Sequence, residues 1–596
     1  MKKLLALFVI VSCFSACKKD KKTIEIDITT VVTNTAFESA LDSYHQEGLK
    51  LNPLNATSAG DNRYNDQLPN FLSDNYIKQL KDYYENYFDK VNKFDDAELT
   101  KSQQLSKQVL NWDAQINMES LKYNEDFTPI NQMWTLHLTI GQLAGGTSSQ
   151  PFKTIQDYKN WLERVDVYLQ WMNSAEEKMI KGIEAGHVLP KSLIVKVLPQ
   201  LEALTTTNVD EHLFYNPIKN FPDSFSEEDK TKVAKVYEAK IKDEIAPAYK
   251  KLHDFMSTTY LEAGRETSGI SDIPNGKAYY NHQIKKYTTT KMTADEIHEL
   301  GLKEVARILS EMEAVKKQVG FEGEIISFFD FVRTNKELMP YKKASSIITN
   351  FNEIHNTMKP QIEKLFDLKP KTAFEVRRTE AFREASASAE YNPGALDGSR
   401  PGIFYTPIPD ATKYNVFSDE ALFLHEAIPG HHFQISLQRE NKDLPDFRKT
   451  LWYSSYGEGW ALYCESLGKE LGLYTDPYQY FGMLSMEMHR AIRLVVDTGI
   501  HTKGWSREKA ITYSLENEAE SEASITSEIE RYMANPGQAL SYKIGQLKIL
   551  ELRAKAEKEL GDSFNIAQFH NQVLESGCIP LALLEIKIDN WIESVN

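Results

Sequence analysis

Apolar residues recur three and four positions apart between charged residues along most of the chain. The segments Asn75–Tyr84 and Lys153–Ile183 show this spacing, which is the pattern of amphipathic helices with one buried face. Thr293 and Glu296 have the spacing of a capping box and predict the start of a helix over Ile297–Val319. The pattern therefore predicts a mainly α fold in which helices pack on one another.

Turn residues interrupt the helical pattern. Gly264–Gly276 is rich in Gly, Ser and Pro and predicts a seam between an N-terminal helical region, 35–270, and a C-terminal helical region, 271–596. Tyr391–Pro407 contains turn residues and then Ile-Phe-Tyr-Thr, which is typical of a strand. This strand has two interpretations, edge pairing with an extended peptide or a structural hairpin. Tyr287–Thr290 predicts another short extended piece.

The first residues predict export. Two lysines precede the apolar run Leu4–Phe14, which is typical of a signal peptide and is shorter than the roughly 20 residues that span a membrane. Small residues before Cys17 resemble a bacterial lipobox. We therefore expect residues 1–17 to be a lipoprotein signal peptide with Cys17 as the lipidation site, and 18–34 to be a tether. An ordinary signal peptide is the alternative. The predicted location is the bacterial cell envelope, lipid-anchored, periplasmic or outer-membrane facing.

Composition narrows the classes of function. The chain has 596 residues and a net charge of −16, which disfavours a nucleic-acid binder because phosphate backbones attract positive surfaces. Cys13 would leave with the signal peptide and Cys17 would carry lipid, which leaves Cys464 and Cys578 in the exported body of the protein. Two cysteines make no disulfide framework. We expect buried free thiols there, with a single pairing as the alternative.

One short segment concentrates residues with metal-binding chemistry. A predicted helix ends in His425 and Glu426. In zinc peptidases with the sequence H-E-x-x-H, two histidines four positions apart share a helix face and bind the metal, and the glutamate is the general base. Here Pro429 occupies the position of the second histidine, and His431 and His432 follow.

A regular helix would not bring either later histidine to the metal. His431 would point to another side, and His432 would share the face but lie about 10 Å further along the axis, too far for bonds of about 2 Å. Pro429 lacks an N–H and Gly430 accepts unusual backbone angles, so together they favour a helix bulge that stores two residues. The bulge would turn His431 onto the metal, with His432 as the alternative ligand.

A later segment offers the third ligand. Glu458 and Glu465 lie two turns apart on one face of a helix predicted to begin near Tyr456. In two-histidine, one-glutamate sites the carboxylate comes from a following helix. One glutamate would bind the metal and the other would orient a histidine. The alternative is a pair of solvated charges, which the neighbouring Trp460 and Tyr463 make less favourable.

Three motifs, in this order along the chain, resemble the bacterial domain-of-unknown-function family 885: His425–Gln434, Glu458–Glu465 and Asn535–Gly545. That family is grouped with zinc metallopeptidases whose third ligand is glutamate. The resemblance implies a helical, metallopeptidase-like fold with a deep channel and a small β element before the metal helix. It also implies these site residues: His425, His431 and Glu458 as zinc ligands, and Glu426 as general base.

Further residues predict how a substrate is held. Tyr542 follows a Pro-Gly-Gln turn at a helix start and would donate to the oxyanion of an acyl-transfer reaction; a buried structural tyrosine is the alternative. Arg531 and Arg493 would bind a substrate carboxylate through the guanidinium fork. His501 is a further candidate for that role, and His432 is a further candidate for contacting substrate or supporting the ligands.

These features predict a zinc-dependent hydrolase that cleaves peptide bonds in short peptides, with 271–596 as the catalytic region. One alternative is a non-catalytic helical lipoprotein that binds nutrients, which predicts no bound metal and no role for Glu426. Another is a glycosidase that uses two of Glu426, Glu458 and Glu465. The glycosidase would remain active after metal chelation.

Overall fold

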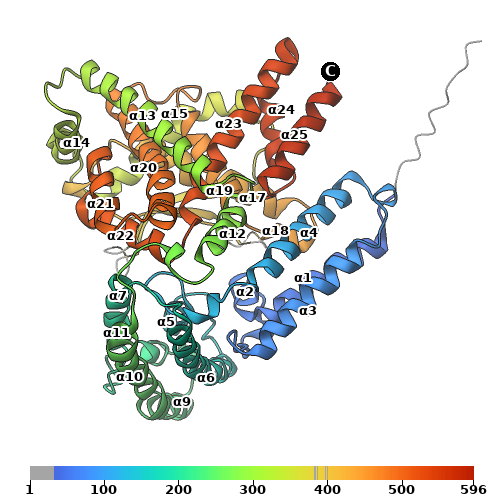
Figure 1. Ribbon diagram of the computed structural model, residues 1–596, viewed down its shortest axis with the longest axis vertical. Coiled ribbons are helices and arrows are strands. Elements are labelled where there is room, and N and C mark those ends of the chain that lie inside the picture. The colour runs from blue at the N-terminus through green and yellow to red at the C-terminus, as the bar shows by residue number, and fades with distance from the viewer. Residues whose placement is uncertain (1–31, 381–383, 385–386, 396–397, 399, 596) are drawn as a thin grey trace, which may run out of the picture.

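The computed structural model describes residues 32–380, 384, 387–395, 398 and 400–595 (Figure 1). The fold is mainly α with one small sheet, which confirms the predicted class. The predicted signal peptide, Cys17 and residues 18–31 of the predicted tether lie outside the described residues. Within the described ranges, no helix combines the length and apolarity needed to cross a membrane.

The first helices pack on the C-terminal half rather than forming a unit with the helices that follow them. They appear in blue in Figure 1. Phe37, Tyr87 and Val109 from these helices are fully or almost fully buried in the same hydrophobic cluster as residues beyond 270. The helices are α1 (Thr35–Leu51), α2 (Pro53–Ser58), α3 (Asp74–Val91) and α4 (Lys101–Ser120).

A second hydrophobic cluster is built by the helices between residues 136 and 263, shown in teal and green at the bottom of Figure 1. Aromatic rings such as Trp161, Tyr168 and Tyr249 fill it. The boundary expected near residue 270 stays a prediction. The helices are α5 (Leu136–Ala144), α6 (Ile155–Ala185), α7 (Lys191–Glu202), α8 (Asn216–Lys219), α9 (Glu227–Lys240), α10 (Ala246–Phe255) and α11 (Leu261–Ala263).

The remaining helices include α16, α17, α19 and α23, which carry candidate site residues. In chain order, the remaining helices are α12 (Gly276–Thr288), α13 (Ala294–Gln318), α14 (Ile325–Thr334), α15 (Ala344–Leu365), α16 (Asp419–Glu426), α17 (His431–Glu440), α18 (Asp446–Lys449), α19 (Ser454–Ser466), α20 (Pro477–Thr502), α21 (Arg507–Asn517), α22 (Glu522–Ala534), α23 (Ser541–Leu560), α24 (Ile566–Leu574) and α25 (Leu581–Val595). Helix α13 lies along α20, and α19 lies along α23. The predicted capping box of Thr293 and Glu296 is formed at the start of α13.

A three-stranded sheet precedes α16. Its strands are β1 (Phe374–Arg378), β2 (Glu390–Asn392) and β3 (Gly402–Thr406), in the order β1-β3-β2. Strand β3 is parallel to β1 and antiparallel to β2. All five residues of β3 are buried, which confirms the predicted strand.

Of two further sequence predictions, one for an extended segment is wrong and one for the cysteines is confirmed. The extended piece predicted at Tyr287–Thr290 is wrong, because α12 continues to Thr288. The hydroxyl of that residue donates to the Ile284 carbonyl within the helix, so this threonine is satisfied in helical backbone. Cys464 and Cys578 are buried free thiols, as expected.

Candidate metal centre

The chain between His425 and His431 leaves the helical conformation completely, so the predicted bulge is wrong. Helix α16 ends at Glu426, and α17 begins at His431. Between them Ala427 has ψ −109° and Gly430 has ψ −126°, both far from helical values, and the Ile428–Pro429 peptide bond is cis. The two histidines therefore belong to two separate helices, whose relative direction is set by a four-residue link.

Gly430 is required where this link folds back on α16. A Cβ atom at this position would lie 2.0 Å from the His425 carbonyl oxygen and 2.3 Å from that of Leu424. The indole N–H of Trp460 in α19 donates to the Pro429 carbonyl at 2.9 Å and holds the link from the other side. Backbone contact and a buried hydrogen bond together place His431 opposite His425.

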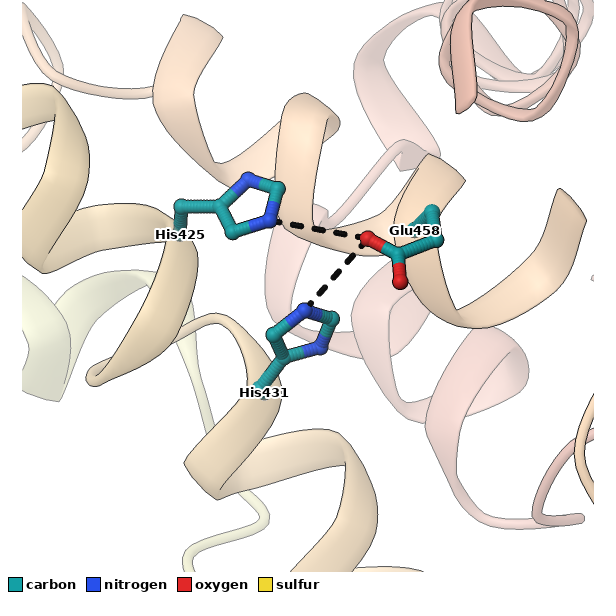
Figure 2. A group of neighbouring side chains, drawn as sticks. All are labelled: His425, His431 and Glu458. Carbon is teal, nitrogen blue, oxygen red and sulfur yellow. Dashed lines mark ion pairs between the residues drawn. The ribbon is translucent and has the colours of Figure 1, made fainter. Parts of the chain in front are cut away.

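His425, His431 and Glu458 point toward one another (Figure 2). Oε2 of Glu458 lies 3.6 Å from Nε2 of His425 and 3.5 Å from Nε2 of His431. One ligand atom from each residue lies within 4.8 Å of the others. Ligands at tetrahedral angles and bonds of about 2.0–2.2 Å are separated by about 3.3–3.6 Å. The two distances from Glu458 and the set of two nitrogens and one oxygen are compatible with a zinc ion.

Glu465 fixes the orientation of His425 from behind. Its Oε1 lies 2.7 Å from Nδ1 of His425, and Glu465 is 1% exposed. The contact of Nδ1 with this carboxylate leaves Nε2 as the ring nitrogen that faces Glu458, as in carboxylate–histidine–metal arrangements. Nδ1 of His431, by contrast, has no partner among the described residues.

The pKa shifts of His425 and Glu458 show that the charged groups of the cluster interact strongly. Burial would lower the pKa of His425, but Glu458 and Glu465 outweigh it and raise this pKa to about 9. Burial would raise the pKa of Glu458, yet His431 and His425 hold it well below its usual value. A carboxylate and two imidazoles thus meet in one cluster, in which both histidines are buried and Glu458 is partly exposed, and this arrangement suits a cation at its centre.

Glu426 lies beside this cluster. Burial raises its pKa, although His425 and His431 act in the opposite direction. The backbone N–H of Tyr391 in β2 donates to the Glu426 carboxylate. A carboxylate whose proton affinity is raised in this way is suited to general-base chemistry near neutral pH.

Close helix packing brings Tyr542 to Glu458. A Cβ at Gly459 in α19 would lie 2.5 Å from Gly545 of α23, and a Cβ at Gly545 would lie 1.8 Å from the Ser455 carbonyl oxygen. The two backbones touch there because neither glycine has a side chain. Burial raises the pKa of Tyr542, and the nearby Glu458 raises it further. The hydroxyl is therefore within electrostatic reach of the cluster.

Arg493 and Arg531 share one carboxylate next to Tyr542. Glu528 accepts from Nη2 of Arg493 at 2.9 Å and from Nε and Nη2 of Arg531, also at 2.9 Å. The Arg493 guanidinium lies 4.5 Å from the centre of the Tyr542 ring. Nη1 of Arg493 is buried and has no hydrogen-bond partner within the described part of the chain. This N–H group lies near the candidate centre and is available to donate a hydrogen bond to a ligand.

Two predicted histidines lie outside the cluster. Nδ1 of His432 is 2.9 Å from the Tyr391 hydroxyl, and burial lowers the pKa of this imidazole to about 4. His432 therefore supports the sheet behind Glu426. His501 is completely buried, with Nδ1 accepting from the Ile270 N–H at 3.0 Å and Nε2 lying 3.1 Å from the Tyr532 carbonyl. Neither ring nitrogen of His501 is left for a substrate.

Two residues that sequence reasoning missed also border the cluster. The Trp452 ring lies 5.9 Å from the His431 ring, and a Cβ at Gly457 would lie 2.0 Å from Trp452. Tyr391 adds the backbone contact to Glu426. A bulky residue before a glycine-rich helix start was the one signal available for Trp452. No local pattern marks Tyr391.

The helices, the small sheet and the buried cluster define a helical protein with a candidate His-His-Glu metal centre. Residues 53–588 match the family described as "bacterial protein of unknown function (DUF885)", and the chain belongs to this family. This confirms the resemblance at the level of the family. The sequence matches no curated protein.

Two solved structures are similar along nearly their whole length. A "putative lipoprotein" from Colwellia psychrerythraea is 28% identical, with a TM-score of 0.85, and the alignment covers 95% of this chain and 100% of the other. A "putative lipoprotein of unknown function" from Shewanella oneidensis is 16% identical, with a TM-score of 0.74 and coverage of 92% and 99%. The second similarity concerns the fold alone.

Proposed function

We propose that this protein is a zinc-dependent peptidase that hydrolyses short peptides. The observation that carries the proposal is the convergence of His425, His431 and Glu458 at the spacing of zinc ligands. Glu465 behind His425 supports it, because a buried carboxylate on the far nitrogen is the usual support of a metal-binding histidine.

The residues have separable roles in this reaction. His425, His431 and Glu458 would hold the ion, which when bound supplies Lewis acidity toward the scissile carbonyl and toward water. Glu426 takes a proton from the water that adds to the carbonyl carbon. It then passes this proton to the amine nitrogen as the C–N bond breaks. Tyr542 donates a hydrogen bond to the oxygen on which negative charge develops.

The surroundings support a peptide as substrate. Strand β2 lies at the edge of its sheet, and its residue Tyr391 faces Glu426 through the backbone, so an extended peptide laid along this edge reaches the general base. The unpartnered Nη1 of Arg493 offers a donor for a peptide carboxylate. The deep channel implied by the family resemblance would restrict access to short peptides, and it stays a prediction.

The proposal is tested by combining metal analysis with peptide turnover. The purified mature chain is expected to hold one zinc ion per molecule, and His425→Ala is expected to lose it. Glu426→Gln is expected to keep zinc but to lose about 10²–10⁴-fold in kcat on a mixed peptide library. Glu322→Gln, which changes an exposed glutamate before α14, is the matched control and retains full turnover.

Each alternative function has its own outcome in this experiment. Absence of stoichiometric zinc together with unchanged behaviour of Glu426→Gln contradicts the peptidase and favours the nutrient-binding lipoprotein. Hydrolysis of glycosides that survives chelation favours the carboxylate-pair glycosidase.

We also propose that Cys17 anchors the protein in the bacterial cell envelope. The lipobox-like sequence before Cys17 supports this, as do the relatives named putative lipoproteins. Cys17→Ser is expected to abolish labelling by a radioactive or alkynyl fatty acid and to release the protein from the membrane fraction. Equal labelling of the parent and the variant contradicts the anchor.

A further inference from the structure

A cavity of about 930 Å³ lies between the N-terminal helices and the segment that leads into α19. Helices α1, α2 and α3 form one side, and α18 with Trp452 forms the other. The residues that matter for its chemistry are Tyr44, Tyr83, Tyr84, Asp113 and Trp452. We call it the Asp113 pocket.

Asp113 is the carboxylate of this pocket that has no cation. It accepts hydrogen bonds from the Tyr44 hydroxyl and, at 3.3 Å, from Nδ2 of Asn117. No ion pair joins it to any described residue. The other two aspartates that line the pocket are neutralised by close partners: Asp61 by Arg63 at 2.6 Å and Asp446 by Lys449 at 2.8 Å.

Asp113 also lies where an unpaired charge is unfavourable. Burial raises the pKa of its carboxyl group, while the bonds from Tyr44 and Asn117 act in the opposite direction. The Tyr453 hydroxyl is buried, has no hydrogen-bond partner in the described part of the chain and interacts electrostatically with Asp113. A partly buried carboxylate of this kind is stabilised strongly by an incoming cation.

Aromatic rings line the same pocket as the carboxylate. Tyr44 stacks on Tyr83 with ring centres 5.0 Å apart, and Tyr83 meets Tyr84 edge-on at 5.1 Å. Further rings of the lining are Tyr76, Phe447 and Trp452. Aromatic faces attract ammonium and guanidinium groups and also pack on their methylene stems. A carboxylate inside an aromatic lining is therefore the chemistry of an organic-cation site.

The Asp113 pocket shares a wall with the candidate metal centre. Trp452 lines the pocket and its ring lies 5.9 Å from that of His431. Gly457 leaves room for Trp452 directly before the candidate ligand Glu458. Arg439 also lines the pocket; it donates to the Gly394 carbonyl at 3.2 Å, on the side of the β element. The Trp452 side chain thus lies between a group bound in the pocket and the candidate metal centre.

We propose that the Asp113 pocket binds the ammonium or guanidinium group of a peptide whose cleaved bond lies at the metal centre. This inference rests on the proposed peptidase function for its catalytic consequence, whereas cation binding itself does not depend on catalysis. The cation has two sources in a peptide, a lysine or arginine side chain and a free α-amine. Both carry the chemistry that Asp113 and the tyrosine rings recognise.

Turnover of matched peptides tests the specificity. Four peptides combine lysine or its uncharged isostere norleucine beside the cleaved bond with a free or acetylated amino terminus. The parent protein is expected to cleave the cationic peptides with kcat/KM about 10–100-fold higher, the range for a charge-assisted hydrogen bond. Asp113→Asn is expected to remove this preference and leave the norleucine peptide with an acetylated terminus within about threefold of the parent. Asp446→Asn, a paired carboxylate of the same pocket, is expected to retain the preference.

Direct binding separates this inference from the proposed function. Zinc-loaded and zinc-free Glu426→Gln protein is titrated with three probes: Nα-acetyl-lysine methylamide, norleucine methylamide and Nα-acetyl-norleucine methylamide. The first carries a side-chain cation, the second an α-amine and the third neither. Binding of a cationic probe at least tenfold tighter than the neutral one, lost in the double variant with Asp113→Asn, supports the pocket even if no peptide is cleaved.

Other results overturn the inference. If the parent cleaves lysine and norleucine peptides equally and Glu426→Gln binds all three probes alike, the pocket is not a cation site although the peptidase stands. This comparison needs no Asp113 variant, so it decides the question even if Asp113→Asn fails to fold. Urea unfolding and zinc content of each variant are measured alongside, and a cationic preference that persists in folded Asp113→Asn also contradicts the inference.

Discussion

Replacing Glu465 by glutamine removes the negative charge behind His425 while preserving the size of the side chain. The carboxylate is 1% exposed and its Oε1 lies 2.7 Å from Nδ1 of the imidazole. Hydrogen bonds to charged groups contribute about 1.5–3 kcal/mol, and a tenfold change in affinity corresponds to about 1.4 kcal/mol. The expected loss of zinc affinity is therefore about 10–100-fold, which agrees with the usual effect of such partners.

Two substitutions of Glu465 are expected to weaken zinc binding to different degrees. Glutamine keeps an oxygen that can accept from Nδ1 of His425, so Glu465→Gln is expected near the lower end of this range. Alanine removes the acceptor and leaves a buried N–H without a partner, so Glu465→Ala is expected near the upper end or beyond it. Glu470→Gln is the control, because Glu470 is 39% exposed in its side chain and pairs with Arg553 at 2.9 Å.

Zinc affinity is measured by competition with a chromophoric chelator at constant pH, with urea unfolding of the zinc-free proteins as a check on folding. The expected order of dissociation constants is parent and Glu470→Gln, then Glu465→Gln, then Glu465→Ala. If both Glu465 variants are folded and bind zinc within twofold of the parent, the carboxylate does not support a ligand, and the assignment of His425 as a ligand loses the support of Glu465 and rests on the convergence with His431 and Glu458 alone.

Three further predictions concern the same region. Tyr542→Phe is expected to lower kcat about 10²–10³-fold with little change in KM, because it removes one oxyanion donor; steady-state kinetics on a single peptide checks this. Gly430→Ala places a methyl group 2.0 Å from the His425 carbonyl oxygen and is expected to cost about 1–3 kcal/mol in urea unfolding and to weaken zinc binding. Burial raises the pKa of Asp419 to about 8 from 3.8. Between these pH values the folded state binds one more proton than the unfolded state, so the free energy of unfolding falls as pH rises, by about 1.4 kcal/mol per unit. Urea unfolding of the parent at pH 5 and pH 8 should show this loss relative to Asp419→Asn; equal pH dependence of the two contradicts it.

The sequence predicted those parts of the site that lie on regular helices. Glu458 and Glu465 are seven residues apart, and an uninterrupted α19 places both on the face turned toward His425. The helical period alone shows that residues seven positions apart share a face, and no information on the neighbouring helices is needed. The same period explains why the helices α3 and α6 were predicted from apolar spacing, whereas α13 was predicted from its capping box.

The helical period could not predict the backbone conformation of the link between α16 and α17. Proline and glycine indicated a departure from the helix, but the backbone angles of Gly430 depend on two tertiary contacts. One is the approach to the His425 carbonyl, and the other is the bond from Trp460 to Pro429. Both partners lie outside the link itself. His501 is the opposite case, because its residue type suggested a substrate contact. Both of its ring nitrogens contact backbone groups of distant segments, so its role is structural.

Helix α19 combines several of these roles in consecutive residues. Gly457 makes room for the tryptophan that separates the Asp113 pocket from the cluster, Glu458 is the candidate ligand, and Gly459 allows α23 to approach. Trp460 holds the link before α17, and Glu465 holds the first histidine two turns later. A shift of this helix would move the candidate ligand Glu458 and would change its contacts with Trp452 and with α23, which carries Tyr542. Substitutions at the two glycines should therefore change zinc affinity and cation preference in parallel, whereas Asp113→Asn should change the preference alone.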